Sequence, residues 1–398
     1  MEIWEKNLWV CWFGVFATSA GLSQLIPILP LFIEQLGVHN VSEIEEWSGI
    51  AYGVTFILMA IFSPIWGKAA DRYGRKPMLL RASMGMALVL TCMGFVQNVY
   101  QLVGLRMLQG TISGYYSAAI TLVATQTPRE RSGWALGTLS TGAVAGTLLG
   151  PLIGGAVAEL LGIRSIFFMI GALLVVAFLA AWLFVSENFV PSEIKAPKSS
   201  EIWHMLPCPE IMIAMFVTTL ILQLALMSIQ PILTVYITEL SSDKSHIALV
   251  SGLVFASSGL ASMVAAPRLG ALADRVGPQK VMAVALLAAG LLFIPQALVR
   301  NPWELMGLRF LLGIATASLL PSINSMIRQI TPDNVIGRVY GYNQSAQFIG
   351  SFAGAVMVGQ IASGFGIHTV FFCTSILLLI NAVWVYFLVC KKTAARGD

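Results

Sequence analysis

Runs of about twenty mostly apolar residues recur along the whole chain, and each is long enough to cross a lipid bilayer. At 1.5 Å per helical residue, about twenty residues cover the roughly 30 Å hydrocarbon core. Lipid offers backbone N–H and C=O groups no partner, so each run is predicted to be a helix, and the alternation typical of barrel strands is absent. We predict twelve spans, which begin near Leu8, Glu46, Pro77, Val99, Trp134, Arg164, Pro209, His246, Pro278, Asn301, Ile336 and Ile367.

The composition agrees with a membrane protein and argues against several other classes. Charged residues make up 11% and apolar residues 57% of the chain, against roughly 25% and 45–50% in an ordinary soluble domain. The five cysteines lack CxxC or CxxH spacing, so neither a disulfide framework nor a metal site is expected. Motifs for a phosphate-binding loop, a zinc protease or a nucleophile elbow are missing, and we expect no cofactor and no enzymatic activity.

The cations lie almost entirely on one side of the predicted spans. All but five of the 23 Lys and Arg residues fall in loops or helix ends on this side; the five are Arg106, Arg164, Lys244, Arg300 and Arg309. Because cytoplasmic loops carry an excess of Lys and Arg, this side is predicted to be cytoplasmic, with both termini inside the cell membrane. The formal net charge of +4 therefore reflects membrane orientation, and nucleic acid is not an expected partner.

The chain contains two copies of one six-helix unit. "GKAADRYG" at residues 67–74 returns as "GALADRVG" at residues 270–277, and Arg106 and Arg309 keep the same offset of 203 positions. Such a register indicates a tandem duplication with both copies in the same orientation. The predicted parts are an N-terminal bundle at residues 1–187, a cytoplasmic linker at residues 188–208 and a C-terminal bundle at residues 209–398.

A six-plus-six parallel repeat with GxxADRxG after the second and the eighth helix resembles the major facilitator superfamily. "GTLLGPLIGG" in the fifth helix resembles a motif of its drug:proton antiporter branch, and "LRMLQG" in the fourth resembles the arginine motif of that branch. "SGWALGTLSTG", "APRLG" and "YNQS" resemble the MdtG-type multidrug efflux transporters. The resemblance covers essentially the whole chain. It implies an all-α membrane protein with the major facilitator fold, in which twelve transmembrane helices form two pseudo-symmetric six-helix bundles.

The charged loop after the second helix is predicted to set orientation and also to latch a gate. The positive-inside rule explains its cations but neither Asp71 nor its glycines, which permit close approach and tight turns. The resemblance implies that Asp71 contacts the start of the eleventh helix near Arg338, and that Asp274 makes the equivalent contact near Arg131. The predicted latch residues are Gly67, Asp71, Arg72, Gly74, Arg75, Arg131, Asp274, Arg275 and Arg338.

Glycines recur every four residues along the predicted fifth helix and form one smooth stripe. The stripe consists of Gly142, Gly146, Gly150 and Gly154, with Pro151 in its middle, where proline removes a backbone hydrogen bond and permits bending. Close packing of membrane helices would by itself account for such a stripe. We expect in addition that it lies at a sliding seam between the two halves, since the motif resembles the antiporter-type helix that the family has only in its first half.

Polar side chains inside the predicted spans are candidates for a central substrate cavity. Arg106 lies about seven residues, or roughly 10 Å, into its span, and an arginine at that depth indicates a functional site. Snorkelling to the outer headgroups is the alternative, and it fits Arg309 better; any single amide could instead bridge two helices. The cavity candidates are Arg106, Gln24, Gln109, Tyr115, Tyr116, Gln223, Gln230, Asn324, Asn343 and Gln347.

No Asp or Glu lies in the middle of any predicted span. A proton-coupled exporter needs a carboxylate whose protonation competes with substrate, and burial raises the pKa of such a group. Glu34 is our first choice, although a solvated helix end beside Glu43, Glu45 and Glu46 explains it equally well. An arginine in the cavity without a central acid favours neutral, zwitterionic or anionic amphiphiles over permanent cations.

The resemblance implies secondary active transport, in which small amphiphilic compounds leave the cytoplasm in exchange for protons by alternating access. Sugar or metabolite export is one alternative. A non-transporting receptor is another, because a fold does not determine function. The expected partners are amphiphilic small molecules, protons and the lipid bilayer, and we expect a monomer.

Overall fold

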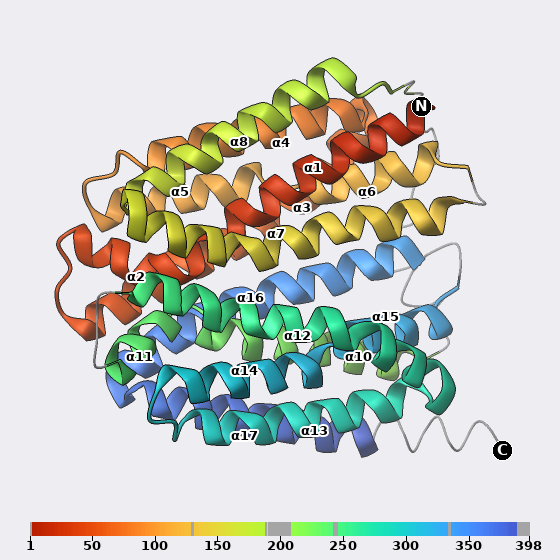
Figure 1. Ribbon diagram of the computed structural model, residues 1–398. Helices are drawn as coiled ribbons and strands as arrows, with labels where there is room; N and C mark the ends of the chain where they lie inside the picture. The colour runs from red at the N-terminus through yellow and green to blue at the C-terminus, as the bar shows by residue number, and fades with distance from the viewer. Residues whose placement is uncertain are drawn as a thin grey trace. The chain divides into compact units, whose positions relative to one another are not determined.

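The computed structural model describes residues 2–128, 131–187, 189, 208–241, 246–332 and 336–387, and its regular elements in these ranges are all helices (Figure 1). The chain divides into two compact units. Unit 1 comprises Met1–Glu193 and Asp243–Ala256, and unit 2 comprises Ile194–Ser242 and Ser257–Asp398. The side chains of Asp71, Ser132, Gly133, Pro267, Ala271, Asp274 and residues 336–338 are outside the described part. So is nearly all of the predicted linker.

The helices of unit 1 repeat in unit 2 in the same order. Unit 1 contains α1 (Ile3–Ser23), α2 (Leu25–Gln35), α3 (Val41–Tyr73), α4 (Arg75–Met93), α5 (Val99–Ile112), α6 (Tyr115–Gln126), α7 (Ser132–Leu161) and α8 (Ile163–Phe184). Unit 2 contains α10 (Pro209–Ile229), α11 (Leu233–Leu240), α13 (Pro278–Gln296), α14 (Pro302–Thr316), α15 (Leu319–Ile330), α16 (Ile336–Phe365) and α17 (Ile367–Val385). The helix α12 (Ile247–Val276) contributes its first ten residues to unit 1 and the rest to unit 2.

Most of these helices are long and apolar enough to cross a membrane. Among the described residues nine helices qualify, and ten when the bent pair α1 and α2 counts as one span. The two remaining predicted spans are helical as well: α4 begins with Arg75 and Lys76, and α5 and α6 are separated by Ser113 and Gly114. The first helix of each of the twelve spans begins within five residues of its predicted start, and four spans are divided into two helices, with the second part formed by α2, α6, α11 or α15. Apolar length therefore located the spans well.

Two helix breaks coincide with prolines at equivalent positions of the repeat. The axes of α1 and α2 meet at 43° around Gln24, and Pro27 has no N–H to donate to the carbonyl four residues earlier. Pro231 occupies the equivalent place between α10 and α11. The break between α5 and α6 instead uses Gly114, whose φ of +126° is strained for other residues.

Single glycines with positive φ join four pairs of consecutive helices. Gly74 (φ +93°) and Gly277 (φ +99°) follow α3 and α12, and Gly162 and Gly366 (both +85°) follow α7 and α16. A positive φ costs a residue with a Cβ roughly 1–3 kcal/mol in such regions, so glycine is suited to these one-residue corners. The corners recur 203 and 204 residues apart, which matches the duplication read from the sequence.

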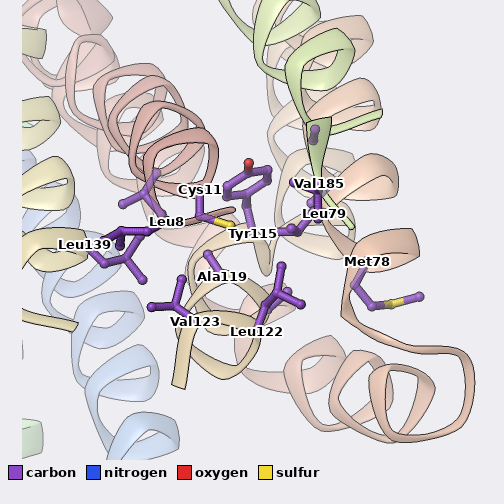
Figure 2. Packing of buried hydrophobic residues seen from close by; sticks show 14 of the residues in the cluster. Leu8, Cys11, Met78, Leu79, Tyr115, Ala119, Leu122, Val123, Leu139 and Val185 are labelled. Carbon is purple, nitrogen blue, oxygen red and sulfur yellow. The ribbon is translucent and has the colours of Figure 1, made fainter. Parts of the chain in front are cut away.

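Packing inside each unit follows the repeat as well. In unit 1, α1 packs on α7 and α4 packs on α8, while in unit 2 the equivalent pairs are α10 with α16 and α13 with α17. Figure 2 shows an apolar cluster of unit 1 to which α1, α4, α6, α7 and the end of α8 contribute. Tyr115 is 2% exposed in this cluster, beside Cys11 and Leu79. The tyrosine predicted for a cavity thus belongs to the core of unit 1, and its hydroxyl has no hydrogen-bond partner.

Candidate functional site

Arg106 joins α5 to α3 inside unit 1. Its side chain is 1% exposed, and its Nε donates to the carbonyl of Ala51 at 2.8 Å. Nη1 donates to Oε1 of Gln109 at 2.7 Å and Nη2 to the carbonyl of Tyr52 at 3.4 Å, while the guanidinium lies 5.4 Å from the centre of the Tyr52 ring. These acceptors are neutral oxygens. The structure therefore brings Arg106 and Gln109 together, as components of a buried clamp between two helices.

The equivalent arginine of unit 2 has lost part of this arrangement. Arg309 is 6% exposed, and its Nε and Nη2 have no hydrogen-bond partner. Leu312 stands 203 residues after Gln109 and cannot accept a hydrogen bond. Because the side chain is buried in the protein, snorkelling to the headgroups is the wrong interpretation of Arg309. An unpaired buried cation is costly, so the repeat has kept the charge without its partners.

The glycine stripe of α7 packs against α1 within unit 1. A Cβ atom at any of the four positions would lie 2.4–3.1 Å from a backbone carbonyl oxygen. For Gly142, Gly146, Gly150 and Gly154 these carbonyls belong to Trp12, Phe16, Ala20 and Gln24 respectively. The smooth side of the stripe is therefore occupied by a helix of its own unit, as close packing alone would require, and the sliding seam between the halves stays a prediction. α7 continues as a helix through Pro151.

A second close approach joins α7 to the first turns of α12, also within unit 1. A Cβ atom at Gly155 would lie 2.5 Å from the carbonyl of Ala248, and one at Gly252 would lie 2.6 Å from the carbonyl of Pro151. Just beyond these contacts, Glu159 and His246 form a partly exposed pair. The sequence did not indicate Gly155 and Gly252, because the four-residue glycine period marks one face of α7, whereas Gly155 lies on another face and Gly252 lies on α12.

The charged loop after α3 is held by the end of α8. The carboxylate of Glu187 accepts hydrogen bonds from the backbone N–H of Arg75 (2.8 Å) and of Lys76 (2.7 Å), at the start of α4. The Lys76 ammonium donates to the carbonyl of Val185 at 2.7 Å. A Cβ atom at Gly74 would lie 2.9 Å from Oε2 of Glu187, so the glycine makes room for this acid. An anion at a helix N-terminus is favourable, and Glu187 thus fixes the corner.

The predicted latch itself stays a prediction. The side chains of three of its members lie outside the described part of the chain: Asp71, Asp274 and Arg338. Arg131 is described; its side chain is 64% exposed and approaches Glu5 of α1 at 3.9 Å. Arg72 lies over the ring of Tyr73, and Arg275 is exposed in the last turn of α12. At Gly67 a Cβ atom would meet open space.

Two predicted cavity residues of unit 2 are hydrogen-bonded to each other. Nδ2 of Asn343 on α16 donates to Oδ1 of Asn324 on α15 at 3.2 Å, and the Tyr340 hydroxyl donates to the Asn324 carbonyl at 3.1 Å. The next residue of α16, Gln344, donates to Gln347 one turn further along at 3.4 Å. The amides of α15 and α16 therefore form two hydrogen-bonded pairs, of which Asn324 with Asn343 joins the two helices.

The remaining four cavity candidates differ in burial. Gln24 is fully buried at the bend between α1 and α2, and both of its amide atoms lack a hydrogen-bond partner. Tyr116 on α6 is 39% exposed. Gln223 lies half-buried on α10, and Gln230 follows the last residue of that helix. Gln24 and Tyr116 belong to unit 1, whereas Gln223 and Gln230 belong to unit 2.

The acidic residues at the outer helix ends differ sharply in burial. Glu34, the predicted proton carrier, is exposed at the end of α2. Glu45 on α3 is 4% exposed and is the only buried carboxylate among the described side chains, so its grouping with solvated acids was wrong. Glu239 lies on α11, outside the candidate spans, and partial burial raises its pKa while His368 opposes the shift.

A duplicated all-helical bundle with these spans, one-residue corners and buried polar clamps is the architecture of a secondary transporter. The sequence profile of the Major Facilitator Superfamily matches residues 11–243 and 215–397. The chain belongs to this superfamily and is a multi-pass membrane transporter, with no relation to an enzyme among these comparisons.

Curated relatives match nearly the full chain. It is 46% identical over 382 residues to the multidrug resistance protein MdtG of Salmonella typhimurium, covering 96% of this chain and 95% of the relative. The MdtG protein of Salmonella paratyphi B is 45% identical with the same coverage. These identities confirm the predicted resemblance to the MdtG-type proteins.

Solved structures share the fold at low sequence identity. A bacterial homologue of the human lysosomal transporter Spinster superposes with a TM-score of 0.82 at 14% identity, covering 97% of both chains. The nucleoside transporter NupG superposes with a TM-score of 0.78 at 13% identity, covering 98% of this chain and 100% of its own. These likenesses establish the major facilitator fold.

Proposed function

We propose that this chain is a proton-coupled multidrug efflux transporter, which exports small amphiphilic compounds by alternating access. The observation that carries the proposal is the 46% identity over 96% of the chain to proteins named for multidrug resistance. The positive-inside pattern supports a location in the cell membrane with both termini in the cytoplasm. Energy then comes from the proton gradient.

The buried groups favour neutral or anionic substrates over permanent cations. Arg106 and Arg309 are buried cations, whereas the buried polar groups of the described spans include a single carboxylate, Glu45. A fixed positive charge in a low-dielectric interior repels a cationic substrate and attracts an anionic one. The amide pair of Asn324 and Asn343 would supply hydrogen bonds that orient a polar end of the substrate.

Glu45 is a stronger candidate for proton coupling than Glu34. A proton carrier must change charge as it moves between water and protein, and desolvation favours its protonated form. Glu45 is 4% exposed, while Glu34 remains exposed to solvent. On α3, Glu45 precedes Ser48 and Tyr52 by three and seven residues, which places it on the helix face that carries the Arg106 clamp.

The decisive experiment measures dye accumulation in inverted vesicles, whose cytoplasmic face is outside, with and without an imposed pH gradient. Wild-type protein should export a neutral amphiphilic dye only when the gradient is present. Glu45→Gln should abolish the dependence on the gradient, because glutamine cannot exchange a proton. Glu43→Gln, an exposed acid of the same helix turn, is the matched control and should leave efflux unchanged.

Other outcomes would redirect the proposal. If Glu34→Gln removes the gradient dependence and Glu45→Gln does not, the proton site is at the end of α2, as the sequence alone predicted. Efflux that survives an ionophore would point to facilitated metabolite export. If no amphiphile tested is transported, a non-transporting receptor on the same fold would be the better description.

The gate latch is part of the same proposal. Asp71 and Asp274 would each bind the start of a helix in the opposite half when the cytoplasmic side is closed. Asp71→Asn should therefore slow efflux without lowering the amount of protein in the membrane. Efflux kinetics identical to wild type would refute a latch at this residue.

A further inference from the structure

Unit 2 has an apolar groove between α12, α13 and α14. The groove has a volume of about 300 Å³ and is lined mainly by aliphatic side chains. Leu272, Val276, Val284 and Ile314 line it and are 36–66% exposed, so the groove opens outward from the helices. Lys280, in the first turn of α13, also lines it. The groove thus combines an apolar floor with one cation near its end.

The length of the groove along α13 is similar to the thickness of a single membrane leaflet. Its residues on α13 run from Lys280 to Ala288, which is about 12 Å along a helix axis at 1.5 Å per residue. One leaflet contributes half of a hydrocarbon core of roughly 30 Å. Lys280 lies at the helix end that the positive-inside rule assigns to the cytoplasm. The apolar part of the groove therefore lies in the cytoplasmic leaflet and the cation at its headgroup level.

The equivalent place in unit 1 is occupied by the protein itself. The Arg81 guanidinium of α4 stacks on the ring of Trp66 at 3.5 Å, and its Nη2 donates to the carbonyl of Ser113 at 3.1 Å. The residues 203 positions later are Val284 and Leu269, and both line the groove. Unit 2 therefore lacks the indole and the guanidinium that fill this place in unit 1, and the groove occupies the corresponding space.

We propose that this groove binds an anionic phospholipid of the cytoplasmic leaflet, with an acyl chain along the aliphatic walls and the phosphate at Lys280. An acyl chain matches a lining that is aliphatic apart from Lys280 and Ser318, and basic side chains between transmembrane helices attract anionic headgroups. The depth of one leaflet and the single cation at its headgroup level together favour a lipid over a soluble ligand. The site lies outside the buried polar groups assigned to transport, and its occupancy does not depend on the proposed function.

Native mass spectrometry of the full-length protein tests the proposal, with phosphatidylglycerol and phosphatidylcholine of equal chain length as probes. Wild-type protein should retain phosphatidylglycerol more tightly. Lys280→Gln should weaken phosphatidylglycerol binding about fivefold and leave phosphatidylcholine unchanged, since one basic group near an anionic surface is worth about 1 kcal/mol. Leu269→Trp, which restores the bulk present in unit 1, should weaken both lipids.

Arg268→Gln is the matched charge control, because Arg268 is an exposed cation of α12 that does not line the groove. It should leave both affinities unchanged. Equal losses in Lys280→Gln and Arg268→Gln would mean diffuse attraction by surface charge and would overturn the proposal. Unchanged binding in Leu269→Trp would do the same. Displacement of both lipids by an uncharged amphiphilic dye, with no preference for phosphatidylglycerol, would assign the groove to transported substrate instead.

Discussion

Replacing Gly146 by alanine tests the packing of α7 on α1. The new Cβ atom would lie 2.4 Å from the carbonyl oxygen of Phe16, 2.8 Å from Cβ of Ser19 and 2.9 Å from the backbone nitrogen of Ala20. Ordinary contact begins at about 3.4 Å, so the two helices must separate by about 1.0 Å. Two of the three neighbours are backbone atoms, which no rotamer change can move.

The expected cost lies at the upper end of the range for overpacking, about 2–3 kcal/mol. At roughly 2–4 °C per kcal/mol for a unit of this size, the thermal midpoint should fall by about 5–10 °C. The measurement is thermal unfolding of the purified protein in detergent, followed by intrinsic tryptophan fluorescence. Trp12 is one of the ten tryptophans and lies at the same contact, where its ring is near Gly142, so it contributes to the unfolding signal.

Gly137→Ala is the control, because it lies on the same helix and its Cβ would meet no atom within 4 Å. That change should be neutral or slightly stabilising, since alanine favours helix over glycine by about 1 kcal/mol. If Gly146→Ala unfolds at the same temperature as Gly137→Ala, the stripe does not serve close packing on α1 and the reasoning fails.

Three further predictions follow, and two of them compare matched positions. Gly74→Ala should destabilise the protein more than Gly162→Ala. Both glycines have positive φ, where an alanine costs about 1–3 kcal/mol, but only at Gly74 would the new Cβ atom also crowd the Glu187 carboxylate. Arg106→Leu should lower stability by about 2 kcal/mol, at about 0.6 kcal/mol for each of three hydrogen bonds in a membrane. Arg309→Leu should be neutral or stabilising, because it removes a buried cation with two unpaired nitrogens. Glu187→Gln should cost about 0.5–1 kcal/mol and slow efflux, because the charge at the start of α4 is lost. Thermal midpoints in detergent decide each prediction: equal midpoints within either pair, or a wild-type midpoint for Glu187→Gln, would contradict it.

Hydrophobic length and internal repetition allowed the helices to be predicted from the sequence. The spans follow from the cost of unpaired backbone groups in lipid, which depends on composition over a window and not on any partner. The corner at Gly74 could be predicted as a turn because its repeat, Gly277, occupies the same place in the same motif. These features are local, and the chain contains the information about them in contiguous stretches.

Contacts between helices could not be predicted in the same way. A four-residue glycine period indicates that one face of α7 is smooth, but it does not indicate that α1 occupies this face. The burial of Glu45 depends on the rotation of α3, since Glu43 and Glu46 in the same turn are exposed. Glu187 is the last residue of the predicted N-terminal bundle, and its role appears only when the segment after α8 lies beside the start of α4. Each of these results requires the tertiary structure.

The duplication preserves backbone geometry more faithfully than side-chain chemistry. A Cβ at Gly350 would lie 2.3 Å from the Leu220 carbonyl, nearly the distance found for Gly146, so α10 and α16 share the tight seam of α1 and α7. At the paired arginines the partners differ, because the Gln109 amide has no counterpart at Leu312. Selection on the close packing of these helix pairs must therefore act equally in both units, whereas a function that depends on a charged or polar side chain can be confined to one unit. By this argument Gly350→Ala should destabilise as much as Gly146→Ala, and a much smaller effect would mean that the two bundles have diverged in packing as well as in chemistry.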